Sequence, residues 1–207
     1  GYSSVYSDND LIDLQMMAYS GVRNKRIVEL LQTRGINAIG LSGLDGQLIR
    51  GRRNRGIKIR EGEKKKLIRD LSGKAEAINT GLLATLLEMG MAPVLTIPIL
   101  DEQGIAINSE NDDIVALLQK SMNIRTVIHL IESGGFLRDP EDPNSIVPNM
   151  DQSTLIRWEA EADGRIKRKL HSLKGMIEQG VEKIVIADGR GENPVRDALD
   201  GRGTVIE

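Results

Sequence analysis

The chain has 207 residues, with 28 Lys and Arg against 30 Asp and Glu, and a formal net charge of −2 at pH 7. This balance shows no general preference for nucleic acid or for a membrane surface, and no apolar run approaches the roughly 20 residues that span a bilayer. Zero cysteines exclude disulfides, thiolate metal sites and cysteine nucleophiles, which is typical of a cytoplasmic enzyme. Because the sequence opens on Gly1 without an initiator Met, we expect further residues upstream.

Two helical patterns open the chain. Ser7 or Asp8 is placed to cap a helix whose apolar residues recur at helical spacing, and a second apolar stripe stops before Gly35. Residues 36–41 are predicted to form a short buried strand. The small-residue segment 42–46 follows, and it either brings backbone N–H groups close to a ligand or is a plain hairpin turn.

Residues 50–69 form a basic arm that carries ten Lys and Arg residues. Ile57 and Ile59 alternate with Lys58 and Arg60, which predicts a protruding β-hairpin. Such a charge run is most often a solvated arm. Alternatively, it docks an acidic partner, because clustered like charges raise the local potential and the association rate. Nucleic acid is disfavoured, because aromatic residues for base stacking are scarce and the chain as a whole is acidic.

The middle of the chain predicts a strand that leads into a polar helix start. Residues 75–88 have an amphipathic helical pattern closed by Gly90, and the apolar run 92–99 predicts a buried strand. A turn at 101–104 precedes the polar segment 108–113, which stands at a strand-to-helix junction. Ligands bind at such junctions in open α/β sheets. An Asx turn with a helix N-cap is the simpler alternative.

The second half predicts alternating strands and helices. Residues 125–131 form a strand pattern followed by paired glycines, which suit a nucleotide-binding edge although glycines alone are a weak signal. This alternation favours an α/β fold with a mostly parallel sheet between helical layers. Neither His129 nor His171 has metal-ligand spacing, so we assign no metal-binding residues. The other predicted elements are helices over 155–162, 165–180 and 195–199 and strands over 181–187 and 204–206.

Several motifs then occur in a specific order along the whole chain. They are 22–31 (VRNKRIVELL), 37–46 (NAIGLSGLDG), 93–98 (PVLTIP), 106–108 with Asp112, 164–170 (GRIKRKL) and 187–206. In this order they resemble the amino acid kinase superfamily, in its acetylglutamate kinase branch. Within that branch the sequence is most similar to kinases of lysine biosynthesis that phosphorylate α-aminoadipate attached to an amino-group carrier protein.

The resemblance implies a fold and an organisation. The family fold is a three-layer α/β sandwich around a central, mostly parallel sheet. A single domain over 1–207 is expected, with a substrate-side lobe over about 1–100 and a nucleotide-side lobe over about 101–207. The family's amino-terminal Lys-Gly-Gly strand and glycine-rich loop, which hold phosphate and a second catalytic lysine, are missing from this sequence. Homodimers are common in the family, and the first helices are expected to supply the contact.

The resemblance also implies a reaction, the formation of an acyl phosphate from ATP with Mg²⁺. The acceptor carboxylate is already ionised at neutral pH, so the protein must align two anions and offset the charge on the phosphoryl oxygens. The implied roles are amino acid binding by Asn108, orientation of the catalytic lysines by Asp112, stabilisation of the transferring phosphoryl group by Lys169, and nucleotide contact by Glu132, Gly134 and Gly135.

The acceptor is expected to be aminoadipate or glutamate, either carrier-linked or acetylated. An acidic carrier would dock on the arginines of the basic arm, which are Arg50, Arg52, Arg53 and Arg55. Some residues depart from the family pattern: Val5 stands where relatives have a substrate-binding arginine, Glu110 adds an anion near the substrate, and Ile131 and Glu132 replace a Ser/Thr-Asp pair. These departures leave open an alternative, a catalytically impaired paralogue that binds an amino acid, a nucleotide or a kinase partner.

Overall fold

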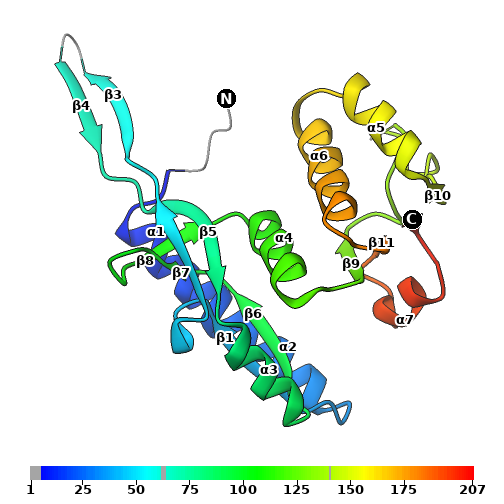
Figure 1. Cartoon of the computed structure of the whole chain (residues 1–207), viewed down its shortest axis with the longest axis horizontal. Helices are drawn as coiled ribbons and strands as arrows, with labels where there is room; N and C mark the ends of the chain where they lie inside the picture. The colour runs from blue at the N-terminus through cyan, green and yellow to red at the C-terminus, as the bar shows by residue number, and fades with distance from the viewer. Residues whose placement is uncertain (1–5, 62–63, 140) are drawn as a thin grey trace. The chain divides into compact units, whose positions relative to one another are not determined.

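The computed structural model describes residues 6–61, 64–139 and 141–207, with side chains described outside 57–67 and outside positions 164, 165 and 168 (Figure 1). It shows an α/β fold that divides into two compact units, Gly1–Leu117 and Leu118–Glu207. The sequence placed the division of the lobes near residue 100, and the compact units divide at residues 117 and 118. Within the described part of the chain, no helix combines the length and the apolar character that crossing a membrane requires.

A long helical stretch opens the first unit. It consists of α1 (Asn9–Gln15), the π-helical segment η1 (Met16–Arg23) and α2 (Asn24–Gln32). Asp8 caps it as expected, because its side chain accepts a hydrogen bond from the Leu11 N–H at 2.9 Å. After α2 the chain turns at Gly35, whose φ of +75° is in the left-handed region that favours glycine.

One face of this helical stretch carries exposed apolar side chains. Ile12 is buried, but Tyr19 and five large non-aromatic residues of the stretch remain 48% to 60% exposed. We call these five the α1–α2 face. They are Leu14, Met17, Val22, Ile27 and Leu30.

The strand β1 (Ala38–Ser42) pairs in parallel with β6 (Ala92–Thr96). The turn after β1 enters the short 3₁₀ helix η2 (Asp45–Gln47). The first N–H groups of the segment 42–46 bond inside the protein. The Gly43 N–H donates to the carbonyls of Thr96 and Pro98, and the Ser42 N–H donates to the Asp45 carboxylate. The segment 42–46 is not a hairpin turn, because β1 pairs with β6 and the strand that follows the segment pairs with strands other than β1, and its approach to a ligand stays a prediction.

Four strands close into a small barrel in the order β2 (Ile49–Arg53), β5 (Ser72–Ile78), β8 (Ala106–Ser109) and β7 (Ile99–Leu100). The prediction of one helix over 75–88 is wrong in its first part, because residues 75–78 belong to β5. Helix α3 spans only Thr80–Glu88, after Asn79 caps it by accepting from the Leu82 N–H at 3.1 Å. Pairing of β5 with both β2 and β8 outweighs the helical pattern there.

The basic arm forms the predicted hairpin. Strand β3 (Ile57–Glu61) pairs antiparallel with β4 (Lys64–Ile68), and Figure 1 shows the pair projecting from the barrel. After β8, helix α4 (Asn111–Met122) begins at the expected strand-to-helix junction. The barrel thus holds the base of the basic hairpin and the start of α4 in the same unit.

The second unit is a four-stranded sheet in the order β10 (Asn149–Met150), β12 (Thr204–Ile206), β11 (Lys183–Asp188) and β9 (Thr126–Ile131). Strands β9 and β11 are parallel, as are β10 and β12, whereas β11 and β12 are antiparallel. The central strand β11 supplies the core, with Ile184, Val185 and Ile186 fully buried. The helices of this unit are α5 (Gln152–Glu161), α6 (Gly164–Glu178) and α7 (Pro194–Leu199).

Candidate functional site

In the first unit, Asn108 lies near the carboxyl end of β8, beside the amino end of its parallel neighbour β5. It lies opposite Ser72 in the register of β5 and β8, and its main-chain N–H donates to the Leu71 carbonyl at 2.8 Å. The side-chain Nδ2 donates to the Ser7 hydroxyl at 3.5 Å. The half-buried amide therefore lies beside the start of α1 and near the end of β8, directly before α4.

The start of α4 places acidic side chains next to this amide in sequence. Asp112 is exposed in the first turn of the helix, and Asp113 is half-buried. Two acids in a first turn are stabilised by the helix dipole, so their presence has a local structural reason as well as the role that the resemblance implies. Ser109 is buried just before the helix, and its Oγ has no hydrogen-bond partner among the described residues.

In the second unit, charged residues gather at the carboxyl edge of the parallel strands β9 and β11. Ile131 ends β9 opposite Asp188, which ends β11, and the exposed Glu132 follows directly. The Arg190 side chain donates two hydrogen bonds to Asp188, from Nε to Oδ1 at 2.9 Å and from Nη2 to Oδ2 at 2.7 Å. The sequence predicted a nucleotide contact by Glu132 but assigned no role to Asp188 or Arg190. A charged pair directly after a predicted parallel strand was the signal for them.

This charge pair has a measurable electrostatic consequence. Hydrogen bonding by Arg190 lowers the pKa of the Asp188 carboxyl to about 2. In return, Asp188 raises the pKa of the Arg190 guanidinium, and Glu132 adds a smaller electrostatic contribution in the same direction. The edge therefore holds a fixed cation flanked by two carboxylates, and a cation there is suited to contact phosphate oxygens.

The paired glycines after β9 are required by the packing of their own loop. A Cβ on Gly134 would lie 2.6 Å from Ile146 Cδ1, and one on Gly135 would lie 2.7 Å from Thr204 Oγ1. The Thr204 hydroxyl also accepts from the Phe136 N–H at 2.8 Å. Both glycines therefore have a structural explanation, and their contact with a nucleotide stays a prediction.

Lys169 lies in the second turn of α6, half-buried and directly before the core residue Leu170. It belongs to the second unit, as do Glu132 and the paired glycines, whereas Asn108 and Asp112 belong to the first. The structure therefore brings together Asn108 with the start of α4 in one unit, and the strand edge of β9 and β11 in the other.

Among the residues that the structure describes, no group of three or more His, Cys, Asp or Glu side chains could hold a metal ion. A Mg²⁺ ion in a phosphotransferase usually takes only one or two carboxylates from the protein and the rest of its ligands from phosphate and water. Glu132 is an exposed carboxylate at the β9–β11 edge and fits that kind of shared coordination, whereas both oxygens of Asp188 are already bonded to Arg190.

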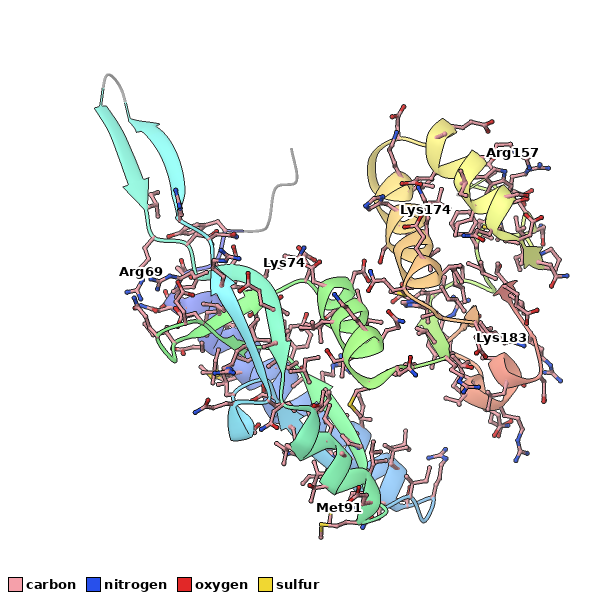
Figure 2. The ribbon with its side chains drawn as sticks, viewed as in Figure 1. Arg69, Lys74, Met91, Arg157, Lys174 and Lys183 are labelled. Atoms are coloured by element: carbon pink, nitrogen blue, oxygen red, sulfur yellow. The ribbon has the colours of Figure 1, made fainter. Side chains whose placement is uncertain are left out.

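The four arginines of the basic arm differ in their surroundings. Arg52 bonds to Glu76 on the neighbouring strand, and Arg53 lies 3.5 Å from the buried carboxylate of Asp101. Arg50 and Arg55 are exposed and form no ion pair with any described residue. Figure 2 shows Arg69 and Lys74 at the end of the barrel from which the β3–β4 hairpin projects. Arg50 and Arg55 are therefore the arginines best placed to meet another molecule.

The chain is similar along most of its length to a known family and to two named enzymes. A profile of the amino acid kinase family matches residues 2–188. The [LysW]-aminoadipate kinase of Thermus thermophilus is 42% identical, over 100% of this chain and 78% of that protein. The acetylglutamate kinase of Phocaeicola vulgatus is 30% identical, over 97% of this chain and 75% of its own length. These matches confirm the resemblance that the motifs indicated.

Solved structures give the fold alone. The N-acetylglutamate synthase from Neisseria gonorrhoeae with coenzyme A and N-acetyl-glutamate aligns with a TM-score of 0.77 and 17% identity, over 97% of this chain and 44% of that one. The carbamate kinase of Giardia aligns with a TM-score of 0.64 and 13% identity, over 91% of this chain and 70% of that one. The expected α/β fold class is thereby confirmed.

The charge pair at the strand edge predicts a pH effect. A carboxylate whose pKa falls from 3.8 to about 2 on folding stabilises the folded state above pH 4 and loses that contribution as the pH drops toward 2. We expect carbon-detected NMR titration to give a pKa of about 2 for Asp188 and a higher pKa in Arg190→Gln, still below 3.8 because the main-chain N–H of residue 190 continues to donate to the carboxylate. Arg196→Gln, an exposed arginine nearby in sequence, is the control and should leave the Asp188 pKa unchanged. An unshifted Asp188 in the unmodified protein would contradict the pairing.

Proposed function

Because the chain belongs to the amino acid kinase family, we propose that it phosphorylates the side-chain carboxylate of aminoadipate, or of glutamate, attached to an amino-group carrier protein. The 42% identity to a [LysW]-aminoadipate kinase over the whole chain is the observation that carries this proposal. The 30% identity to an acetylglutamate kinase makes an N-acetylated acceptor the second candidate. The reaction would belong to lysine or arginine biosynthesis and take place in the cytoplasm.

In the proposed reaction a carboxylate oxygen of the acceptor attacks the γ-phosphorus of ATP. The new bond joins that oxygen to phosphorus, the bond from the γ-phosphorus to the bridging oxygen breaks, and ADP leaves with the electron pair. No proton has to be removed from the nucleophile, so catalysis depends on alignment and on offsetting negative charge. Asn108 would bind the amino acid moiety, Asp112 would orient the catalytic lysines, and Lys169 would stabilise the phosphoryl oxygens.

ATP would bind at the β9–β11 edge, against Glu132, Gly134 and Gly135. Its phosphates need positive charge, and Arg190 supplies a cation that Asp188 holds at this edge. Mg²⁺ bound to the phosphates would offset further charge on them during transfer. Sequence reasoning did not include Arg190, and we add it to the residues proposed for the nucleotide.

The alternative of an impaired paralogue rested on departures from the family pattern. Val5 lies outside the described residues. Glu110 is exposed at the start of α4, and Ile131 is half-buried at the end of β9. The curated relatives reported above are named as kinases, and these names give no support to the alternative. Binding of ATP without turnover would favour it over the kinase.

The carrier would dock on the basic arm. Arg50 and Arg55 have no intramolecular counter-charge among the described residues, so they retain their full field for an acidic partner. Arg52 and Arg53 belong to the same arm, but each already meets a carboxylate of this chain, at Glu76 and at Asp101. The unpaired arginines are therefore expected to contribute more to docking than the paired ones.

We also propose a homodimer that buries the α1–α2 face. Its five apolar side chains are spaced along one helical stretch and are each about half exposed or more. Several exposed apolar side chains on one element are a feature of interaction sites. A second copy of the chain offers the same face, which suits the symmetric contact of a two-fold dimer.

Lys169→Ala tests the reaction and the role of this lysine together. The protein, ATP and Mg²⁺ are incubated with LysW carrying aminoadipate, with LysW carrying glutamate or with N-acetylglutamate, and acyl phosphate is trapped with hydroxylamine. We expect product with the unmodified protein and a turnover lower by about 10² or more in the variant, because one preorganised charge is lost.

Lys167→Ala is the matched control, since Lys167 lies on the same helix and is exposed; its turnover should stay near that of the unmodified protein. Absence of product with every acceptor, while the Thermus relative gives product, would overturn the proposed function. Full turnover by Lys169→Ala would reject only the role of Lys169.

The double variant Arg50→Glu, Arg55→Glu tests carrier docking. Reversing two exposed charges should raise the Kd for LysW by about tenfold or more at low salt, with a smaller loss at high salt because salt screens the interaction. The control Arg34→Glu, Arg157→Glu reverses two exposed arginines outside the arm. Calorimetry that gives the same Kd for both double variants would exclude the arm as the docking surface.

The double variant Val22→Glu, Leu30→Glu tests the dimer. Analytical ultracentrifugation should find a dimer for the unmodified protein and a monomer for this variant, because two charges would be buried without partners. Val195 and Leu199 are 51% and 62% exposed on α7, so Val195→Glu, Leu199→Glu is the matched control and should stay dimeric. A monomeric unmodified protein would refute the proposal.

A further inference from the structure

A buried polar cluster lies where the basic arm joins the barrel. Ser7, Asp70 and Ser72 are each at most 2% exposed. Asp70 immediately follows Arg69, which Figure 2 labels near the base of the hairpin. Burying a carboxylate is costly unless it is hydrogen-bonded, so a buried Asp at this place requires an explanation.

Asp70 satisfies both of its oxygens within the cluster. Its Oδ1 accepts from the Ser7 main-chain N–H at 3.1 Å, and its Oδ2 accepts from the Ser72 hydroxyl at 2.6 Å. The Ser72 oxygen in turn accepts from Nδ2 of Asn54 at 2.8 Å. The two ends of the hairpin segment, at Asn54 and Asp70, are therefore tied to the same serine.

The cluster reaches Asn108 through Ser7. The Ser7 carbonyl accepts from the Leu71 N–H at 2.7 Å, and its hydroxyl accepts from Nδ2 of Asn108 at 3.5 Å. Asp70 and Leu71 thus hold the main chain of Ser7 on both sides, and this restricts the positions that its hydroxyl can reach. A 3.5 Å hydrogen bond is long, so a small displacement of Ser7 would break it.

The direction of the Asn108 amide depends on this contact. A side-chain amide has a donor branch and an acceptor branch, and rotation by half a turn exchanges them. Because Nδ2 is directed to Ser7, Oδ1 stands on the opposite branch and the second Nδ2 hydrogen remains for another acceptor. An amide held in one orientation binds a ligand without the entropy cost of ordering it.

We propose that Asp70 is a positioning residue for acceptor binding, which acts through Ser7 to hold the Asn108 amide in one orientation. This inference rests on the proposed function, since it assigns Asn108 to the acceptor. Asp70 does not contact the reacting atoms. Its carboxylate is the part of the cluster that joins the start of α1 to the end of the basic hairpin.

The first measurement reads the position of the amide without any activity. In protein labelled with ¹⁵N-Asn, the Asn108 side-chain amide signal is identified by its loss in Asn108→Ala. Ser7→Ala should shift this signal because it removes the hydroxyl to which the amide donates, and Asp70→Asn should shift it because an amide nitrogen replaces one of the two carboxylate oxygens that hold Ser7 and Ser72. Asp45→Asn is the matched control: Asp45 also accepts from a main-chain N–H and a serine hydroxyl, both of Ser42, and the Asn108 signal should not move.

The second measurement is steady-state kinetics with the acceptor that the unmodified protein uses. Asp70→Asn and Ser7→Ala should raise the KM for the acceptor about tenfold, the effect of losing one oriented hydrogen bond. The KM for ATP and kcat should stay within about twofold. In an Asn108→Ala background, Asp70→Asn should add less than about twofold, because the group that it positions is already gone.

The outcomes separate the two proposals. An unmoved Asn108 signal, or an Asp70→Asn effect that multiplies fully in the Asn108→Ala background, would overturn the positioning role even in an active enzyme. If Asp70→Asn fails to fold, Ser7→Ala decides, since it keeps the main-chain bonds and removes only the hydroxyl. A protein that shows the shifts but phosphorylates no acceptor would overturn the proposed function, and with it the link from Asp70 to catalysis.

Discussion

Parallel pairing of strands brings distant segments together, and the candidate residues of each unit depend on it. In the first unit β5 and β8 place Ser72 opposite Asn108. In the second unit β9 and β11 place Ile131 opposite Asp188, so the charged residues that follow both strands meet at one edge. Parallel strands need a crossover between them, which is why residues so far apart in sequence serve the same edge.

The two halves hold their carboxylates in different ways. Asp70 is buried and bonded to neutral donors, so its role is to fix geometry, and removal of a partner would leave an unsatisfied buried group. Asp188 is partly exposed and paired with a guanidinium, so it sets the place of a cation that remains accessible. The first arrangement suits the positioning of a neutral amide, and the second suits contact with phosphate.

Sequence patterns predicted the elements that rest on local interactions. Asp8 caps α1 through a neighbour three residues away, the β3–β4 hairpin pairs adjacent segments, and α4 begins directly after its polar junction. The exception is residues 75–78, where pairing with β2 and β8 overrides a helical pattern. Strand pairing is a long-range interaction that periodicity within one segment does not report.

The site was predicted less completely for the same reason. The motif order identified the family, and Asn108 and Glu132 do lie at strand ends. The bond from Asp70 to Ser7 spans 63 positions and the bond from Asn108 to Ser7 spans 101, so no local pattern indicates them. Nor did the sequence show that Arg53 meets Asp101 while Arg50 remains exposed, because that depends on which strands become neighbours in the barrel.

The central claim is that nucleotide binds the β9–β11 edge and that acceptor binds beside Asn108. Hydrogen–deuterium exchange of the full chain, with a non-hydrolysable ATP analogue and Mg²⁺ or with the carrier-linked acceptor, tests it most directly. We expect the nucleotide to slow exchange over 131–136 and 188–191, and the acceptor to slow exchange over 70–73 and 107–112. Protection by the nucleotide only over 70–73 and 107–112, or no protection by either ligand, would contradict this assignment.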